Sequence, residues 1–233
     1  MIILGGCSAP RPPAPTETVR QLSWSRISLP DSVAASSLST TTGELLVGGR
    51  ATAGGDHPVL FVVNASGTAS PVPLHPNSPY AKVADMVSVA ARGNQVVALG
   101  AAHGGAHANF RWTVWTGSKQ GLDDQPQTFE TFGGESAGSL LDIVFTSQGP
   151  AIAGQLGRSG RRSGRRNLAA ARGTLGPAEL CRHRACEHAS GPGRPRAAAA
   201  AGSAMIISGS VITFGDGVEQ RASVWTWPTH DSP

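Results

Sequence analysis

The sequence of 233 residues predicts an all-β fold, and two observations carry that prediction. From residue 24 onward, short apolar runs alternate with turns rich in Gly, Ser, Asn and Pro, a pattern typical of short strands. Charged residues make up only 15% of the chain, whereas Gly and Pro number 30 and 17. This composition excludes a coiled coil or a long helical bundle. The apolar content of 39% suffices for a core. The sequence contains no run of about 20 apolar residues, so no membrane-spanning helix is predicted.

The N-terminus predicts a lipid anchor followed by a tether over residues 1–21. The segment Leu4-Gly5-Gly6-Cys7 resembles a bacterial lipobox, in which the cysteine receives a diacylglyceryl group and acyl chains such as palmitate. Residues 9–15 are rich in proline and favour extended polyproline II, which would hold a domain off a membrane. Only four residues precede the glycines, fewer than a signal peptide needs, so either the start codon lies farther upstream or the export signal is lost. The resemblance implies an extracytoplasmic protein that is attached to the membrane through Cys7.

A motif recurs four times from residue 43 onward, at a period of about 50–55 residues. Each copy is a turn followed by a short apolar strand that ends in glycine, and the copies start 50, 56 and 53 residues apart. The four copies are residues 43–49, 93–100, 149–154 and 202–209. A following strand is predicted over 59–63, 110–117 and 222–227, and a preceding one over 36–42, 85–91 and 141–146. An outer strand is predicted over 24–29, 70–74 and 128–132, which gives four strands per unit.

This organisation resembles a β-propeller, whose blades are four-stranded sheets arranged around a channel. Trp115 and Trp225 end corresponding strands 110 residues apart, which favours this interpretation. A β-sandwich, which also uses short strands and glycine-rich turns, is the alternative. The interpretation places blades one to early three at 22–155 and a partial fourth blade at 198–233. The resemblance implies an incomplete propeller and a longer parent, of six or seven blades.

Residues 156–197 form a basic segment that breaks the third unit. Ten of the 19 basic residues lie there with only two acidic ones, so its net charge is +8 against −4 for the remainder. It contains no Val, Ile or aromatic residue, a composition typical of GC-rich DNA translated out of frame. A shift of one base can restore an Asp/Gly turn and a Trp-ending strand near residue 168, where the missing strand is expected. We therefore predict a disordered, locally frameshifted segment.

The basic segment carries two further binding possibilities. Two thiols and two imidazoles lie within eight residues, a set of ligands that zinc can use, although the spacing is not that of a zinc finger. These residues are Cys181, His183, Cys186 and His188. A frameshift would make them accidental, as it would a disulfide between the two cysteines. No aromatic residue interleaves the arginines, so specific nucleic-acid binding is not expected. No metal or cofactor site is predicted.

Turns between paired strands supply the remaining candidate residues. Asp56 and His57 lie in the first unit, and His103 and His107 in the second. Such residues line ligand sites in some propellers and are solvated in most turns. Asp216-Gly217 is a dipeptide typical of a β-hairpin turn. Asn64-Ala65-Ser66 fits the N-glycosylation sequon, which predicts nothing here because the lipobox-like start is bacterial. No nucleophile elbow, phosphate loop or zinc-protease helix occurs, so no catalytic residue is predicted.

Taken together, the start, the tether and the Trp-ending strands resemble uncharacterised exported propeller proteins of high-GC actinobacteria, of mycobacterial type. The resemblance implies a cell-envelope scaffold, or a module that binds a protein or a glycan of the envelope. The alternative is a propeller hydrolase acting on envelope glycans or peptides. Such an enzyme would bring two or three carboxylates together at one end of the channel.

Overall fold

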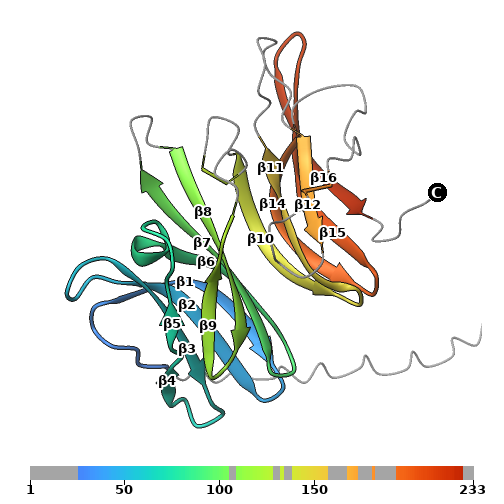
Figure 1. Ribbon diagram of the computed structural model, residues 1–233. Coiled ribbons are helices and arrows are strands. Elements are labelled where there is room, and N and C mark those ends of the chain that lie inside the picture. The colour runs from blue at the N-terminus through green and yellow to red at the C-terminus, as the bar shows by residue number, and fades with distance from the viewer. Residues whose placement is uncertain are drawn as a thin grey trace, which may run out of the picture.

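The computed structural model describes residues 26–104, 109–127, 132–133, 138–156, 167–172, 180–181 and 193–227. Sixteen strands and one 3-10 turn make up its described elements, so the all-β prediction is confirmed. The strands form four separate sheets (Figure 1). Cys7 and the rest of the predicted anchor and tether lie outside the described residues. In the part of the chain that is described, no helix is long and apolar enough to cross a membrane.

Sheets one, three and four are antiparallel, and their strands follow one another in chain order. Sheet one consists of β1 (Val33–Thr41), β2 (Glu44–Ala51), β3 (His57–Val63) and β4 (Ala69–Pro71). Sheet three consists of β10 (Ser139–Thr146), β11 (Gly149–Leu156), β12 (Asn167–Arg172) and β13 (Leu180–Cys181). Sheet four consists of β14 (Gly193–Ala201), β15 (Ala204–Phe214) and β16 (Val218–Trp227).

Sheet two has five strands, of which four follow one another in chain order as a meander. The meander comprises β6 (Asp85–Arg92), β7 (Gln95–Gly104), β8 (Asn109–Ser118) and β9 (Gly121–Gln125). The short strand β5 (Leu74–His75) adds to its outer edge by pairing in parallel with β9. The 3-10 turn η1 (Ala81–Val83) leads from there into β6. The segment that leaves sheet one is thereby held against the outer strand of sheet two.

The strands predicted from the repeated motif lie close to their expected positions, whereas the outer strands do not. Residues 26–29 belong to no strand, although an outer strand was predicted over 24–29. The predicted strand over 70–74 is split between β4 and β5, because Pro73 between them has no N–H to donate to a ladder. Residues 128–131 lie outside the described part. In sheet two, β9 pairs with β8 and was not predicted, and β5 forms the outer edge beyond it.

Each sheet has an irregularity in its first strand, opposite a glycine of the second strand. The register shifts by one residue, as in a β-bulge, between residues 35 and 37, 86 and 88, 140 and 142, and 195 and 197. The glycines opposite these bulges are Gly49, Gly100, Gly154 and Gly209. A Cβ on Gly49 would lie 2.1 Å from the carbonyl oxygen of Ala34, so the close approach of the two backbones requires glycine there.

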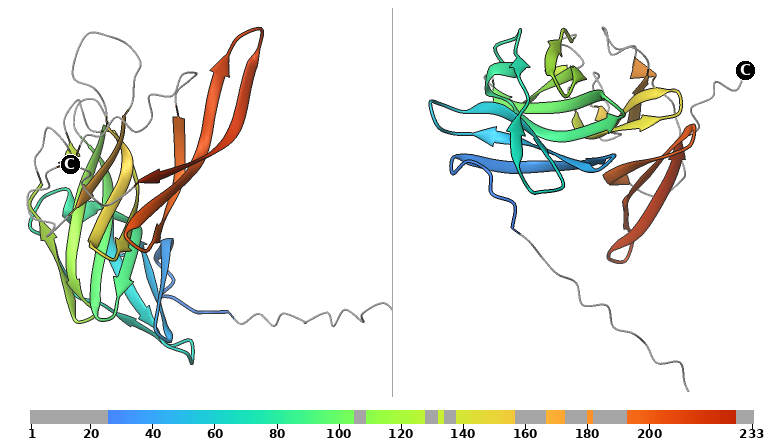
Figure 2. Two further views of the ribbon diagram at one scale, coloured as in Figure 1. Left: turned by 90° about the vertical axis from the view of Figure 1, so that its right-hand side faces the viewer. Right: turned by 90° about the horizontal axis from the view of Figure 1, so that it is seen from below.

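The first strands of successive sheets are linked through the residues that follow these bulges. Ser37 Oγ donates to the carbonyl oxygen of Met86, at 2.7 Å, and Ser88 Oγ donates to Asp142 Oδ1, at 2.5 Å. The other carboxylate oxygen of Asp142 accepts from the backbone N–H of Ala198, at 3.0 Å. The chain of contacts therefore runs from β1 through β6 and β10 to β14, and Figure 2 shows the four sheets following one another.

Sheet two is buried on both faces because it lies between sheets one and three. Val96 and Ala98 pack toward sheet one with Leu46, whereas Val97 and Leu99 pack toward sheet three. This two-sided burial explains why β7 reads as a continuous apolar run rather than as an alternating strand. Between sheets three and four the core is smaller and consists mainly of Ala151, Ala153, Met205 and Ile207.

The predicted basic segment over 156–197 is described only in part. The backbone of β12 pairs with β11 at the place where the third unit was expected to supply its next strand, near residue 168. Strand β14 pairs with β15 across the predicted boundary at residue 197. Its Ala-rich run would favour a helix in isolation, and pairing on β15 overrides that propensity. The frameshift stays a prediction about the coding DNA.

Candidate functional site

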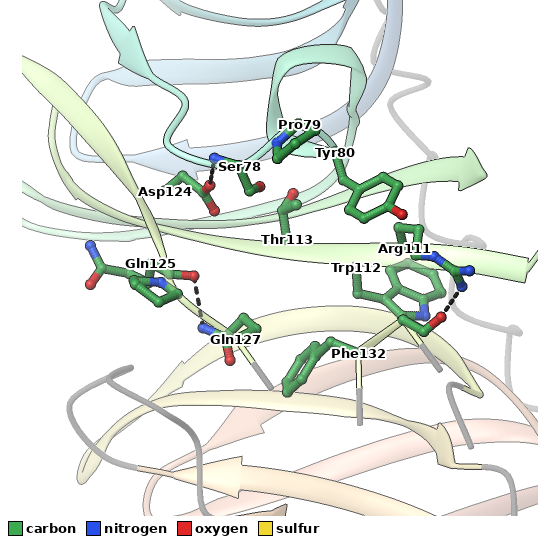
Figure 3. A pocket seen from close by; sticks show the side chains of 12 residues that line it. Ser78, Pro79, Tyr80, Arg111, Trp112, Thr113, Asp124, Gln125, Gln127 and Phe132 are labelled. Atoms are coloured by element: carbon green, nitrogen blue, oxygen red, sulfur yellow. Dashed lines mark hydrogen bonds between the residues drawn. The ribbon is translucent and has the colours of Figure 1, made fainter. Parts of the chain in front are cut away.

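A cavity of about 220 Å³ lies where the first half of β8 meets the end of β9 (Figure 3). Its described wall comes from four segments that are far apart in the sequence: residues 78–80, 111–113, 124–127 and 132–133. Tyr80, Trp112 and Phe132 supply aromatic surface, and Arg111, Asp124 and Gln127 supply polar groups. The cavity therefore combines apolar walls with a few directed polar atoms, which is the composition of small-molecule sites.

Asp124 is a buried carboxylate, with 3% of its surface exposed. Strand β9 places it opposite Trp115 of β8, on the side that faces the core. Its Oδ2 accepts hydrogen bonds from the backbone N–H groups of Asn77 and Ser78, at 3.3 and 3.0 Å. These two donors take the place of water at the carboxylate, and they tie the segment before η1 to the end of β9.

Arg111 is a buried cation on the opposite side of the cavity, with 7% of its surface exposed. Its Nη1 donates to the carbonyl oxygens of Gly133 and Phe110. The guanidinium carbon lies 5.6 Å from the centre of the Tyr80 ring, a cation–π contact. The guanidinium is thereby held rigidly against the aromatic wall.

The aromatic wall is itself fixed by packing and hydrogen bonding. Trp112 Nε1 donates to the carbonyl oxygen of Gly138 at 3.1 Å, and the Trp112 ring stacks on Phe110 with 5.0 Å between centroids. Phe132 is 3% exposed and belongs to the core between sheets two and three. These contacts hold the rings of Trp112 and Phe132 in place before a ligand binds.

Gln127 presents to this wall a buried acceptor that has no donor among the described residues. Its Nε2 donates to the carbonyl oxygen of Gln125 at 3.2 Å, which orients the amide. Its Oε1 is buried and accepts no hydrogen bond. A buried acceptor without a donor costs about 1–3 kcal/mol, so a ligand that donates to this oxygen recovers that free energy.

The described wall of the cavity has few titratable side chains. It contains one carboxylate, Asp124, which already accepts two backbone hydrogen bonds. Neither histidine nor cysteine contributes to it in the described part of the chain. The described residues also contain no group of three or more His, Cys, Asp or Glu that could hold a metal ion.

A second cavity, of about 350 Å³, brings two of the turn residues from the sequence analysis together. Asp56 and His103 line it with Arg50 and Asp85, at the end of sheets one and two. Arg50 Nη1 lies 3.2 Å from Asp56 Oδ2, and both side chains are about half exposed. Asp85 Oδ1 accepts a hydrogen bond from Ser36 Oγ. Arg50 and Asp56 are therefore engaged with each other, and Asp85 with Ser36 of β1.

The other sequence candidates lie apart from both cavities or outside the described residues. His57 contacts the carbonyl oxygen of Gly55 at 2.8 Å, and Asn64 Oδ1 accepts from the N–H of Ser66 at 3.0 Å. Asp216 lies in the turn between β15 and β16. The backbone of Cys181 lies in β13. His107, His183, Cys186 and His188 lie outside the described part.

No linear motif in the sequence marks the residues of the Figure 3 cavity as a site. The local signal was a charge among apolar residues: Arg111 stands between Phe110 and Trp112 in the strand predicted over 110–117. A buried Arg requires partners, which is a reason to expect a polar site beside it. Comparison of the whole chain with protein-family models and with curated proteins finds no match.

Proposed function

We propose that the protein is a lipid-anchored binding protein of the bacterial cell envelope, built on a β-propeller-type scaffold. The anchor rests on the lipobox-like sequence ending at Cys7 and on the proline-rich tether after it. The ligand-binding role rests on the cavity of Figure 3. The proposal agrees with what the resemblance to exported propeller proteins of high-GC actinobacteria implies, namely a binding module of the cell envelope.

Two structural features support the propeller-type interpretation and its repeat. Neighbouring sheets contact one another through their first strands, as blades around a common axis would. The glycines opposite the four bulges recur at intervals of 51, 54 and 55 residues. A β-sandwich would pack two sheets face to face, whereas this chain stacks four small ones.

The observation that carries the binding role is the buried, unpartnered Oε1 of Gln127 beside rigid aromatic walls. A cavity used only for packing would fill with apolar side chains, since an unpaired buried acceptor lowers stability. A ligand with a hydrogen-bond donor resolves that cost, and the preformed wall keeps the entropy loss on binding small.

Ligand-detected NMR with a library of small neutral, anionic and cationic fragments tests this role. We expect fragments that bind the unaltered protein and lose binding in Gln127→Trp, whose ring fills the cavity. The matched control is Gln120→Trp, in the exposed turn between β8 and β9. The absence of any fragment that distinguishes the two variants would contradict a binding function for this cavity.

A hydrolase acting on envelope glycans or peptides is the second candidate function. It is favoured by one observation, the presence of Asp56 and Asp85 with His103 in the second cavity. Two carboxylates are what glycoside hydrolysis requires. Release of soluble sugars or peptides from cell-wall preparations, lost in Asp85→Asn, would support this candidate. Equal release by both proteins would exclude a role for that carboxylate.

A further inference from the structure

We infer that the ligand of the Figure 3 cavity is a neutral sugar, bound as one pyranose ring. The inference rests on the proposed binding function and names its ligand class. The ring has two possible sources, a free monosaccharide or the terminal residue of a glycan.

The charge of the described wall favours a neutral ligand. Arg111 and Asp124 are the only charged side chains among the described lining residues, and their charges cancel. An organic cation would meet the aromatic rings but also the guanidinium, which already lies over Tyr80. An anion would meet the guanidinium but also the buried carboxylate and the Gln127 oxygen. A neutral molecule encounters neither repulsion.

The polar atoms of the wall favour a ligand rich in hydroxyl groups. Gln127 Oε1 is an acceptor that lacks a donor, and the Asp124 carboxylate can accept hydrogen bonds beyond the two that it receives from the backbone. Thr113 Oγ1 accepts from Trp115 Nε1 at 3.0 Å, which leaves its own hydrogen to donate. A sugar hydroxyl both donates and accepts, so adjacent hydroxyls of one ring match such a mixed set. A ligand with acceptors alone leaves the Gln127 oxygen unpaired.

The aromatic walls and the size of the cavity favour a single ring. Tyr80, Trp112 and Phe132 offer apolar surface for the C–H groups of a pyranose, whose hydroxyls project from its edge. A volume of about 220 Å³ lies below the roughly 300–1,000 Å³ of sites that enclose drug-sized ligands. The cavity therefore holds one ring, and any further sugar units of a glycan must extend into solvent.

The test measures binding of a sugar panel to the full chain by ligand-detected NMR and tryptophan fluorescence. The panel contains glucose, galactose, mannose and N-acetylglucosamine, with glucuronic acid as the anionic member and glucosamine as the cationic one. We expect a neutral member to bind and to bind about fivefold more weakly to Gln127→Met, which loses one neutral hydrogen bond. Gln95→Met, the same change at an exposed residue of β7, should leave the affinity unaltered.

A second variant keeps the result interpretable when Gln127→Met folds poorly. Gln127→Glu retains an acceptor oxygen and gives the described wall a net negative charge, so we expect it to shift preference toward glucosamine. An oligosaccharide that ends in the preferred sugar is then compared with the free monosaccharide. Tighter binding of the oligosaccharide would identify the end of a glycan as the ligand, and equal binding of the two would identify a free sugar. Both outcomes support the inference.

Three results would overturn the sugar assignment. One is preferential binding of glucuronic acid or glucosamine to the unaltered protein, and another is a sugar affinity that Gln127→Met leaves unchanged. The third is failure of every sugar while fragments still bind at the cavity, which leaves the binding function standing. If no fragment binds either, the proposed function fails with the ligand class.

Discussion

Asp142 links three sheets, and its replacement by alanine should destabilise the whole stack. Its Oδ1 accepts from Ser88 Oγ in β6 at 2.5 Å and from the N–H of Ile143 at 3.0 Å. Its Oδ2 accepts from the N–H of Ala198 in β14 at 3.0 Å. Asp142→Ala removes all of these acceptors, although the N–H of Ile143 keeps a hydrogen bond to Ser88 Oγ at 3.0 Å.

The expected magnitude follows from the two bonds that find no substitute. A hydrogen bond to a charged group contributes about 1.5–3 kcal/mol, and the partial exposure of Asp142 lets water replace some of it. We therefore expect Asp142→Ala to lower the free energy of unfolding by about 3 kcal/mol. Ser88→Ala removes the bond to Asp142 Oδ1 but leaves the Oδ2 contact intact, and the N–H of Ile143 keeps its bond to Asp142 Oδ1, so the change should cost about 1 kcal/mol.

Urea unfolding followed by tryptophan fluorescence and circular dichroism measures these differences. Asp31→Ala serves as the matched control, because Asp31 is exposed in the turn before β1. A double-mutant cycle between Ser88 and Asp142 should return a coupling free energy of about 1 kcal/mol. The reasoning is refuted if Asp142→Ala costs no more than Asp31→Ala.

Three further predictions concern the bulges, the anchor and the gene. Gly209→Ala should cost about 1–3 kcal/mol in urea unfolding, because its Cβ would lie 2.2 Å from the carbonyl oxygen of Arg194. Gly215→Ala, where no atom lies within 4 Å, should be nearly neutral, and equal costs would contradict the argument from close approach. Labelled palmitate should enter the protein expressed from its full reading frame in an actinobacterial host and be absent from Cys7→Ser; labelling of both would place the lipid elsewhere. Resequencing codons 150–205 from the source organism should reveal inserted or deleted bases at both ends of the basic segment, and an unchanged frame would refute the frameshift.

The sequence predicted the inner part of each sheet well because glycines mark it. Gly43, Gly93, Gly149 and Gly202 open the four motif copies, and all four have positive φ, between 60° and 126°. Side chains rarely adopt that conformation, so the turn depends on glycine. The apolar runs after them form strands that are buried by neighbouring sheets. Local residue type and local structure therefore agree at these positions.

The outer strands and the cavity were not predicted because local residue type and local structure disagree there. Strand β9 carries a buried carboxylate, Asp124, at a position where alternation would predict an apolar residue. The donors that satisfy it lie 46 and 47 residues earlier, in the segment before η1. No spacing rule connects Tyr80, Arg111 and Gln127, which meet only in the folded chain. A site assembled from distant segments leaves no linear motif.

The parallel pairing of β5 with β9 sets an order on folding. Strand β9 is made more than 40 residues after β5, and the meander of β6 to β9 provides the edge on which β5 docks. Closing so long a loop costs conformational entropy, and only the pairing of β5 with the formed edge of β9 offsets that cost. During synthesis or export, sheet two can therefore form from local hairpins while the segment between the first two sheets is still unattached. Docking of that segment, which completes the wall around Asp124, comes late in folding, so a protease present at that stage would cut at residues 73–80 first.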